Sequence, residues 1–431
     1  MQRRFAERPD IFCIIAESGG GNRFLAGDAA LAFQRVCYSG LRERRRASYP
    51  SQGRPNGLGL LRCRKEDHRN MKTRAAVAFA LNEPMRVMEV DLAEPGPGQV
   101  MLKMLASGLC HSDLHLLEGK MSQDFPFIPG HEGLGEIIAL GEGVSGFALG
   151  DHVIPYLVPD CGVCVYCTSG RTNLCVEYGA RRNSARTPFS LDGAPMRCFM
   201  ELGTFAEHTV VAADCIVKVP QHARPDHTCC IACGVTTGLG SALIRAKITP
   251  GSSVAVFGAG GVGLSTMQGA RIAGAGRIFA IDTNPAKEAV ARSCGATDFI
   301  NPWEIENVAE HVIGLTGMGV DYAFDCVGNA KLAEQALEMC HPAWGVAMCV
   351  GVVPEGQSVS TLPTKLLTGR TWTGSMMGGA KRQDVARFVD MYLAGEFSLD
   401  EVVSHRLTLD EINHGVEMMR TGESVRSVVL Y

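Results

Sequence analysis

Four cysteines lie close together in the segment CGVCVYCTSGRTNLC. They are Cys161, Cys164, Cys167 and Cys175, spaced three, three and eight residues apart. Four thiolates at this spacing can surround one tetrahedral metal ion, and the usual ion is zinc. A closed four-sulfur shell leaves no coordination position for a substrate, so the pattern predicts a structural zinc site. A pair of disulfides and a cluster that has lost its metal remain as alternatives.

A glycine turn, Gly258-Ala-Gly260-Gly-Val-Gly263, is the second motif that could do chemistry. It follows an apolar stretch and opens a helical one, and Asp282 ends the next apolar stretch 19 residues after Gly263. This context is the fingerprint of a dinucleotide-binding fold, in which the helix N-terminus receives the pyrophosphate. Asp282 would accept hydrogen bonds from ribose hydroxyls and repel a 2′-phosphate, which predicts NAD rather than NADP. A strand–turn–helix unit without nucleotide is the alternative.

An open metal site must come from scattered residues. The candidates are Cys110 in the run GLCHSDLH, His131 in GHE and Cys233 in ACG. Their spacing alone does not link them. Taken singly, each is more often a buried core residue than a metal ligand.

The elements that must position these motifs are of two kinds. From Met71 to about Val210, short alternating stretches broken by dense turn signals predict a β-rich region with long loops. Beyond Cys233, strands alternate with helices, which predicts a parallel sheet with helices on both faces. The expected strands cover residues 252–257, 277–281, 298–300, 321–325, 345–351 and 425–430, and the expected helices cover residues 261–274 and 286–294. A C-terminal helix should bury one face that carries Ile412, Val416 and Met419.

Length and composition set further limits. The chain has 431 residues, which favours two domains over one core. No apolar run approaches the roughly 20 residues that span a bilayer, so we expect no membrane segment. The N-terminus has no apolar core or cleavage site of a signal peptide. With 17 cysteines and no such signal, we expect metal thiolates and a reducing, cytoplasmic location.

The first 70 residues differ from the rest in charge. They hold 13 arginines and one lysine against seven acidic residues, whereas the whole chain has a net charge of −4. A basic segment is typical of a nucleic-acid-binding arm or a transit peptide. Here the arginine run 44–46 has no interleaved aromatic residues, and transit peptides avoid acidic residues. We therefore interpret residues 1–70 as a disordered or spurious extension ahead of Met71, and we expect no nucleic-acid partner.

From Met71 to Tyr431 the chain resembles the zinc-dependent medium-chain alcohol dehydrogenases, because all three sites occur in that family's order. The resemblance implies a GroES-like, β-rich catalytic domain plus a doubly wound α/β Rossmann domain. It assigns residues 71–235 and 377–431 to the catalytic domain, with a structural zinc lobe at about 158–178, and residues 236–376 to the NAD-binding domain. It also implies two zinc ions per subunit.

The resemblance gives the scattered residues their roles. Cys110, His131 and Cys233 match the catalytic zinc ligands, a two-cysteine, one-histidine set that is already known for alcohol dehydrogenase. Glu132 matches a carboxylate behind the zinc, and Asp113 matches the carboxylate that orients the ligand histidine.

Two further sets of residues follow from the same resemblance. Ser112 and His115 match a relay that carries the proton of the alcohol through the cofactor ribose to the surface. Other positions match contacts to the pyrophosphate, to the nicotinamide ring or to the adenosine ribose. These cofactor-binding positions are His111, Thr237, Gly258, Gly260, Gly261, Val262, Gly263, Asp282, Lys287, Val350, Val352 and Arg426.

These matches predict reversible oxidation of a primary or secondary alcohol, aromatic alcohols included, with hydride transfer to NAD. Leu157 stands where the family's substrate pocket is often aromatic, so we expect a roomier pocket. Three alternatives remain: a nicotinoprotein that keeps NAD bound, an S-(hydroxymethyl)glutathione dehydrogenase, and a catalytically silent relative. The S-(hydroxymethyl)glutathione dehydrogenase branch resembles this chain in the run GRTWTG at residues 369–374. However, this chain has His115 at the position where that branch has a tyrosine. We expect a homodimer or homotetramer with a subunit contact at the strand Thr371–Gly374.

Overall fold

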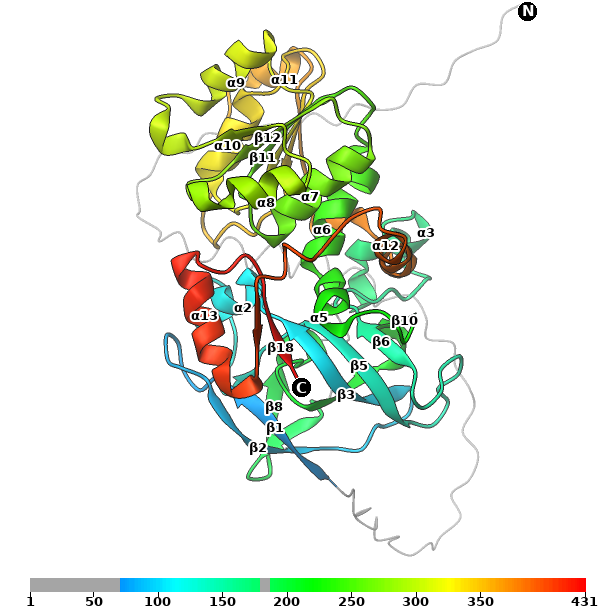
Figure 1. The fold of residues 1–431 in the computed structure, drawn as a ribbon. Helices are drawn as coiled ribbons and strands as arrows, with labels where there is room; N and C mark the ends of the chain where they lie inside the picture. Colours follow the sequence, from blue (N-terminus) through cyan, green and yellow to red (C-terminus); the bar gives the residue numbers. More distant parts are fainter. Residues whose placement is uncertain (1–69, 179–186) are drawn as a thin grey trace, which may run out of the picture. The chain divides into compact units, whose positions relative to one another are not determined.

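The computed structural model describes residues 70–178 and 187–431 (Figure 1). The extension predicted at residues 1–70 lies outside this part of the chain, apart from Asn70. In the described part the strands form three sheets, one of them entirely parallel.

Two mainly antiparallel sheets are built from the first half of the described chain and its C-terminal end. Their strands are β1 (Met71–Val77), β2 (Arg86–Leu92), β3 (Gln99–Gly108), β4 (Phe127–Ile128), β5 (Glu132–Leu140), β6 (His152–Pro155), β7 (Phe189–Leu191), β8 (Ala194–Cys198), β9 (His208–Ala212), β10 (Ile216–Val219), β17 (His405–Leu407) and β18 (Ser427–Leu430). One sheet has the order β1-β2-β7-β8-β4. The other has the order β10-β6-β5-β3-β18-β17, with β9 also paired to β3.

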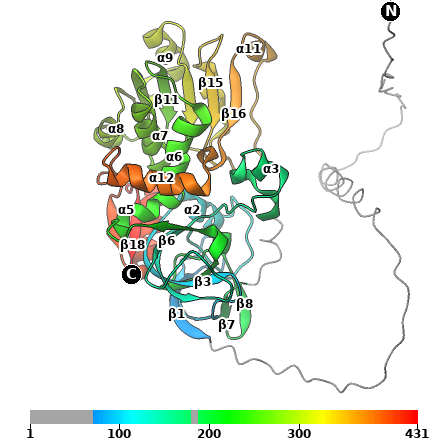
Figure 2. The same ribbon diagram turned by 90° about the vertical axis from the view of Figure 1, so that its right-hand side faces the viewer.

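The parallel sheet is formed by β11 (Ser253–Phe257), β12 (Arg277–Ile281), β13 (Asp298–Ile300), β14 (Tyr322–Asp325), β15 (Val346–Cys349) and β16 (Thr371–Gly374). Its order is β13-β12-β11-β14-β15-β16, so the winding reverses between β11 and β14. In such sheets ligands bind outside the carboxyl ends of the strands at the point of reversal. Figure 2 shows β16 at the side of the sheet, beyond β15.

Alternation along the parallel strands divides their side chains between two cores. Val254 and Val256 belong to a core that α7 (Gly261–Ile272) and α8 (Glu288–Ser293) complete. Ala255 and Phe257 belong to a second core that α9 (Val308–Thr316) and α10 (Ala330–Glu338) complete. Helices therefore cover both faces, as the strand–helix alternation of the sequence predicts.

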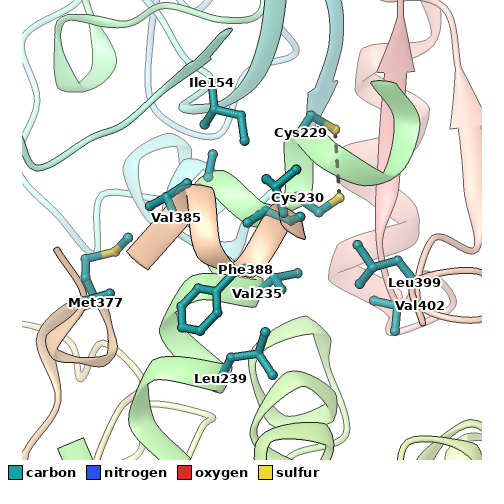
Figure 3. Close-up of a cluster of buried hydrophobic side chains, with 14 of the residues drawn as sticks. Ile154, Cys229, Cys230, Val235, Leu239, Met377, Val385, Phe388, Leu399 and Val402 are labelled. Carbon is teal, nitrogen blue, oxygen red and sulfur yellow. Dashed lines mark hydrogen bonds between the residues drawn. The ribbon is translucent and has the colours of Figure 1, made fainter. Parts of the chain in front are cut away.

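A buried cluster packs α6 (Gly234–Gly240) against α12 (Arg382–Leu393) (Figure 3). Val235 and Leu239 of α6 lie in this cluster with Phe388 of α12. The remaining α-helices are α2 (His111–Leu117), α3 (Val165–Thr168), α5 (Pro225–Thr228), α11 (Pro363–Leu367) and α13 (Ile412–Thr421). Short tight or wide helical turns are η1 (Thr172–Leu174), η2 (Phe199–Glu201), η3 (Ala213–Cys215), η4 (Cys229–Ala232), η5 (Ser241–Ala246), η6 (Pro285–Lys287), η7 (Pro302–Glu304), η8 (Met376–Gly379) and η9 (Leu409–Glu411).

The structure differs from the sequence-based expectation in the first half. The region expected to hold strands and loops contains the helix α2, whose first turn is held by the Asp113 carboxylate. The same region contains the hairpin β7–β8, and residues 179–186 before it lie outside the described part. In the second half, β12 and β13 have the predicted bounds, and Ile412, Val416 and Met419 are buried on α13 as expected.

Among the described residues, no single helix is long and apolar enough to cross a membrane. The consecutive segments Pro225–Ala232 and Gly234–Ala246, which meet at a 60° bend, pass the same test together by length and composition alone.

Candidate active site

Four side chains that can bind a metal converge at one point. The ligand atoms of Cys110, His131, Glu132 and Cys233 all lie within 4.8 Å of one another. Three of these residues are the candidates for an open metal site, which their spacing in the sequence could not connect. The fold therefore supplies the connection that the sequence lacks.

One carboxylate ties two of the candidate ligands together. The Oδ2 atom of Asp113 accepts the backbone N–H of Cys110 (3.2 Å), and its Oδ1 atom accepts that of Gly130 (2.9 Å). The same Oδ1 atom lies 3.2 Å from Nδ1 of His131. A carboxylate only accepts hydrogen bonds, so Nδ1 carries the proton and Nε2 is left as the ligand atom.

The third candidate ligand, Cys233, stands at a break between two helices. It follows η4 and precedes α6, with φ −136° and ψ −76°. Its carbonyl oxygen accepts the N–H of Thr237 (2.8 Å), and this hydrogen bond closes the first turn of α6. The next residue, Gly234, donates its N–H to Oε1 of Glu132 (3.2 Å). The start of the helix thus presents the thiol to the other three side chains.

The two thiols of this group are electrostatically coupled. The hydrogen bond between Cys110 and Cys233 lowers the pKa of Cys110 well below its ordinary value, and His131 and Arg426 lower it further. The same hydrogen bond, together with burial, raises the pKa of Cys233. The pKa values of the two thiols therefore move apart when no metal is bound, and a bound cation would favour the thiolate form of both.

Glu132 contributes a buried carboxylate to the group. Nη1 of Arg426 lies 3.2 Å from each carboxylate oxygen, but the contact with Oε2 lacks hydrogen-bond geometry. Oε2 is therefore buried with no hydrogen bond. Burial raises the pKa of Glu132 well above its usual range, although the charge of Arg426 opposes this shift.

The residues present fit a zinc ion. Two thiols and an imidazole nitrogen form a donor set that zinc accepts, and the buried Oε2 atom of Glu132, which has no hydrogen bond, lies beside them. The Asp113–His131 contact supplies the outer partner that zinc-binding histidines almost always have.

The helix α2 carries the three other residues that the sequence places near this site. Oγ of Ser112 lies 3.8 Å from Sγ of Cys110. His115 is half-buried one turn further along, and His111 is exposed. Burial lowers the pKa of His115, and Lys120 lowers it further. His115 is therefore a neutral imidazole near pH 7.

The four clustered cysteines form a second group whose sulfur atoms all lie within 4.8 Å of one another. The sulfurs of Cys161 and Cys167 are 3.9 Å apart, and those of Cys164 and Cys175 are 4.0 Å apart. A disulfide bond measures about 2.05 Å, so these residues are free thiols. The backbone N–H of Cys167 is the main cause that lowers the pKa of Cys164 to about 6. The group fits the predicted structural zinc site.

The glycine turn lies between β11 and the start of α7. Gly258 has φ +90°, and a Cβ at Gly263 would lie 1.7 Å from the carbonyl oxygen of Gly258. A Cβ at Gly260 would meet nothing within 4 Å, so space is open beside the backbone there. Asp282, at the end of β12, accepts the N–H of Ala259 (2.7 Å) through Oδ2. The turn and the carboxylate thus form one unit, as expected for ribose and phosphate recognition.

The remaining predicted cofactor residues lie near this turn or at the same edge of the sheet. Lys287 reaches Oδ2 of Asp282 at 3.4 Å. Val350 and Val352 follow the carboxyl end of β15, where a Cβ at Gly328 would meet the carbonyl of Val352 at 2.3 Å. Thr237 and Val262 lie on α6 and α7, which pack together through close glycine contacts.

Two residues at the site were not anticipated from the sequence. The ring of Phe199 packs edge-on against His131, with centroids 5.0 Å apart. The second is Met377, whose Sδ accepts a hydrogen bond from Oγ1 of Thr237 (3.5 Å). Met377 has a positive φ of +49° and is followed by Gly378 and Gly379. The glycine pair after Met377 is a signal that could have marked this turn, whereas nothing around Phe199 marks its contact.

Comparison with known proteins places this geometry in a family. Residues 96–221 match the family described as "Alcohol dehydrogenase GroES-like domain" and residues 261–394 match "Zinc-binding dehydrogenase". An S-(hydroxymethyl)glutathione dehydrogenase of Synechocystis sp. is 44% identical over 369 residues, covering 84% of this chain and 100% of the relative. The chain belongs to the zinc-dependent medium-chain alcohol dehydrogenase family. A second S-(hydroxymethyl)glutathione dehydrogenase, from Escherichia coli O1:K1, is 43% identical to this chain over 369 residues, covering 84% of this chain and 100% of the relative.

Solved structures agree with this membership. An alcohol dehydrogenase zinc-binding domain protein from Burkholderia ambifaria has a TM-score of 0.79 at 30% identity, covering 84% of this chain and 99% of the other. The benzyl alcohol dehydrogenase from Acinetobacter calcoaceticus has a TM-score of 0.77 at 27% identity with the same coverage. These comparisons confirm the predicted fold class, a GroES-like domain plus a Rossmann-type sheet. As a zinc-dependent alcohol dehydrogenase, the chain is an NAD-dependent oxidoreductase.

Proposed function

We propose that the chain oxidises a small primary or secondary alcohol to an aldehyde or ketone at the site formed by Cys110, His131 and Cys233. The observation that carries this proposal is the convergence of these three ligands beside the hydroxyl of Ser112. A catalytic zinc site has three protein ligands and one open position, whereas the four-cysteine group is closed. Zinc, when bound, supplies a Lewis acid that lowers the pKa of an alcohol hydroxyl. NAD supplies the hydride acceptor.

The protein's own residues would move the proton and hold the ligands. Ser112 would take up the hydroxyl proton of the substrate as it releases its own, and His115, neutral near pH 7, would take the released proton towards the solvent. Asp113 keeps Nε2 of His131 aimed at the metal by accepting from Nδ1. Glu132 remains behind the ligands, paired with Arg426.

The nucleotide would lie along the carboxyl edge of the parallel sheet. The open space beside Gly260 admits a pyrophosphate, and the carboxylate of Asp282 receives the adenosine ribose. His111 and Arg426 would contact the phosphates, and Lys287 the ribose. Thr237, Val262 and Val352 would press on the nicotinamide ring, and Val350 would be a further contact to the cofactor.

A second candidate substrate is S-(hydroxymethyl)glutathione, because several relatives at 43–44% identity carry that dehydrogenase name. A nicotinoprotein that never releases NAD is the third candidate. One screen separates them: purified protein is supplied with simple alcohols, or with formaldehyde plus glutathione, and reduction of added NAD is followed at 340 nm. Turnover of alcohols supports the first candidate, and turnover that requires glutathione supports the second. Turnover of an artificial acceptor without reduction of added NAD supports the nicotinoprotein.

We also propose a homodimer or homotetramer that associates through the edge strand β16. One edge of β16 is unpaired among the described residues, and Leu362 and Leu367 nearby are 63% and 84% exposed. An exposed edge strand beside apolar side chains is a natural pairing surface. The metal thiolates require reduced cysteines, so we place the enzyme in the cytoplasm. Light scattering of the purified protein tests the assembly.

A further inference from the structure

The guanidinium of Arg426 contacts residues next to two of the proposed zinc ligands. Its Nη1 atom donates to the carbonyl of Leu109 (2.7 Å), the residue directly before the first cysteine ligand. The same atom bonds the carboxylate of Glu132 (3.2 Å), the residue directly after the histidine ligand. Arg426 is 6% exposed and Glu132 is fully buried. If the guanidinium moved away from these partners, its charge would be buried without a partner, so the contacts hold both ligand segments in place.

The other side of the guanidinium touches two glycines. A Cβ at Gly234, directly after the second cysteine ligand, would lie 2.4 Å from Nη2. A Cβ at Gly261, in the glycine turn, would lie 2.2 Å from the same nitrogen. Real Cβ atoms essentially never show contacts below 3.0 Å, so both positions must be glycine for Arg426 to lie where it does. One side chain thus touches the neighbour of every zinc ligand and the phosphate-binding turn.

We propose that Arg426 is a positioning residue that couples retention of the catalytic zinc to the phosphates of the bound nucleotide. A pyrophosphate at the glycine turn holds the guanidinium in its buried place, and the guanidinium holds the three ligand segments. By linkage, zinc in the site also strengthens binding of the pyrophosphate. This inference rests on the proposed zinc ligands, but it goes beyond a phosphate contact because it concerns the metal.

The first experiment measures zinc release from the holoenzyme to a chromophoric chelator, with and without saturating ADP-ribose. ADP-ribose carries the pyrophosphate but lacks the nicotinamide ring, so it does not cover the metal site. We expect two release phases and expect ADP-ribose to slow one of them about fivefold or more, the lower end of typical couplings. The zinc of the four-cysteine group serves as the internal control and should not respond. Equal rates with and without ADP-ribose would overturn the coupling.

A matched pair of glycine variants gives the sharper test. Gly261→Ala places a methyl group against Arg426, whereas Gly314→Ala, in α9, places one in open space. Without nucleotide, we expect Gly261→Ala to release the catalytic zinc several-fold faster than the wild type, and Gly314→Ala to release it at the wild-type rate. Equal rates for the two variants would contradict the proposal. A turn that only binds phosphate predicts no effect of either variant on zinc release in the absence of nucleotide.

Arg426→Lys tests the guanidinium itself, with Arg406→Lys as its control, since Arg406 pairs with Asp226 instead (2.7 Å). Arg426→Lys should release zinc faster and lose the protection by ADP-ribose even at saturation, while Arg406→Lys should behave as the wild type. Normal protection in Arg426→Lys would reject the role. If the proposed catalytic zinc site is wrong, the result differs: the wild-type protein would bind a single zinc ion and show only one phase of zinc release.

Discussion

The Oδ1 atom of Asp113 lies 3.2 Å from Nδ1 of His131, while the Oδ2 atom of the same carboxylate accepts the N–H of Cys110. Asp113 is 2% exposed, so water does not compete for either contact. Two proposed zinc ligands, 21 positions apart in the chain, therefore take their orientation from one side chain.

Replacing Asp113 with asparagine should weaken the catalytic zinc site without unfolding the chain. The amide of the asparagine can turn its nitrogen towards His131. The variant then no longer requires Nδ1 of His131 to be the protonated nitrogen. Partners of this kind contribute roughly 10- to 100-fold to metal affinity or activity. Zinc affinity by competition with a chelator measures the effect. Asp124→Asn, at an 86% exposed carboxylate, is the matched control, and an equal loss in both variants would contradict the role of Asp113.

Replacing Cys164 with serine should remove one zinc ion and loosen the segment around it, with a smaller effect on the chemistry. The segment is linked to η8 by the side-chain amide of Asn173, which donates to the carbonyl of Met376 (2.8 Å). Hydrogen exchange should therefore rise in residues 161–175 and 376–379 but stay slow in the parallel sheet. Cys294→Ala removes a buried thiol outside both groups and should keep both zinc ions. A stable, fully structured but inactive Cys164→Ser protein would argue against a structural site.

Replacing Asp282 with glycine should relax the preference for NAD. The carboxylate that repels a 2′-phosphate disappears, and Lys287, now 3.4 Å from that carboxylate, becomes free to pair with the phosphate. The ratio of kcat/KM values for NAD and NADP should fall by about tenfold or more, equivalent to about 1.4 kcal/mol. Asp298→Asn removes a carboxylate paired with Arg277 instead and should leave the ratio unchanged. An unaltered ratio in Asp282→Gly would remove this residue from cofactor selection.

The acid side of the pH profile should report on His115. As a proton acceptor His115 must be neutral, so kcat/KM falls as the pH drops through its pKa, which burial and Lys120 hold below the ordinary value of 6.5. Lys120→Met removes one of the two causes and leaves Glu118, which raises the pKa, so the acid limb should move to higher pH. His115→Gln should abolish the limb. A limb that stays in place in both variants would assign it to another group.

The sequence predicts the parallel half of the fold better than the other half for a physical reason. Strands such as Arg277–Ile281 are short apolar runs between turn residues, and local pattern alone determines them. The start of α2 depends on Asp113, whose carboxylate also contacts Gly130 and His131, so its role is set by tertiary contacts.

The site shows the same division between local and tertiary information. The four cysteines and the glycine turn are local motifs, and the sequence predicts them directly. The spacing of the three proposed zinc ligands does not link them, so only the resemblance to a family predicts that they form one site. The contacts of Arg426 with Leu109, Gly234 and Gly261 join segments that no local pattern relates.

The most direct test of the proposed catalytic zinc site is the zinc content of a Cys110→Ala protein, measured by elemental analysis together with alcohol turnover and NAD binding. We predict two zinc ions per chain in the wild type and one in the variant, with no measurable turnover and with NAD binding that is weaker but still measurable. Two zinc ions in the variant, or turnover near the wild-type rate, would show that Cys110, His131 and Cys233 do not hold the catalytic metal.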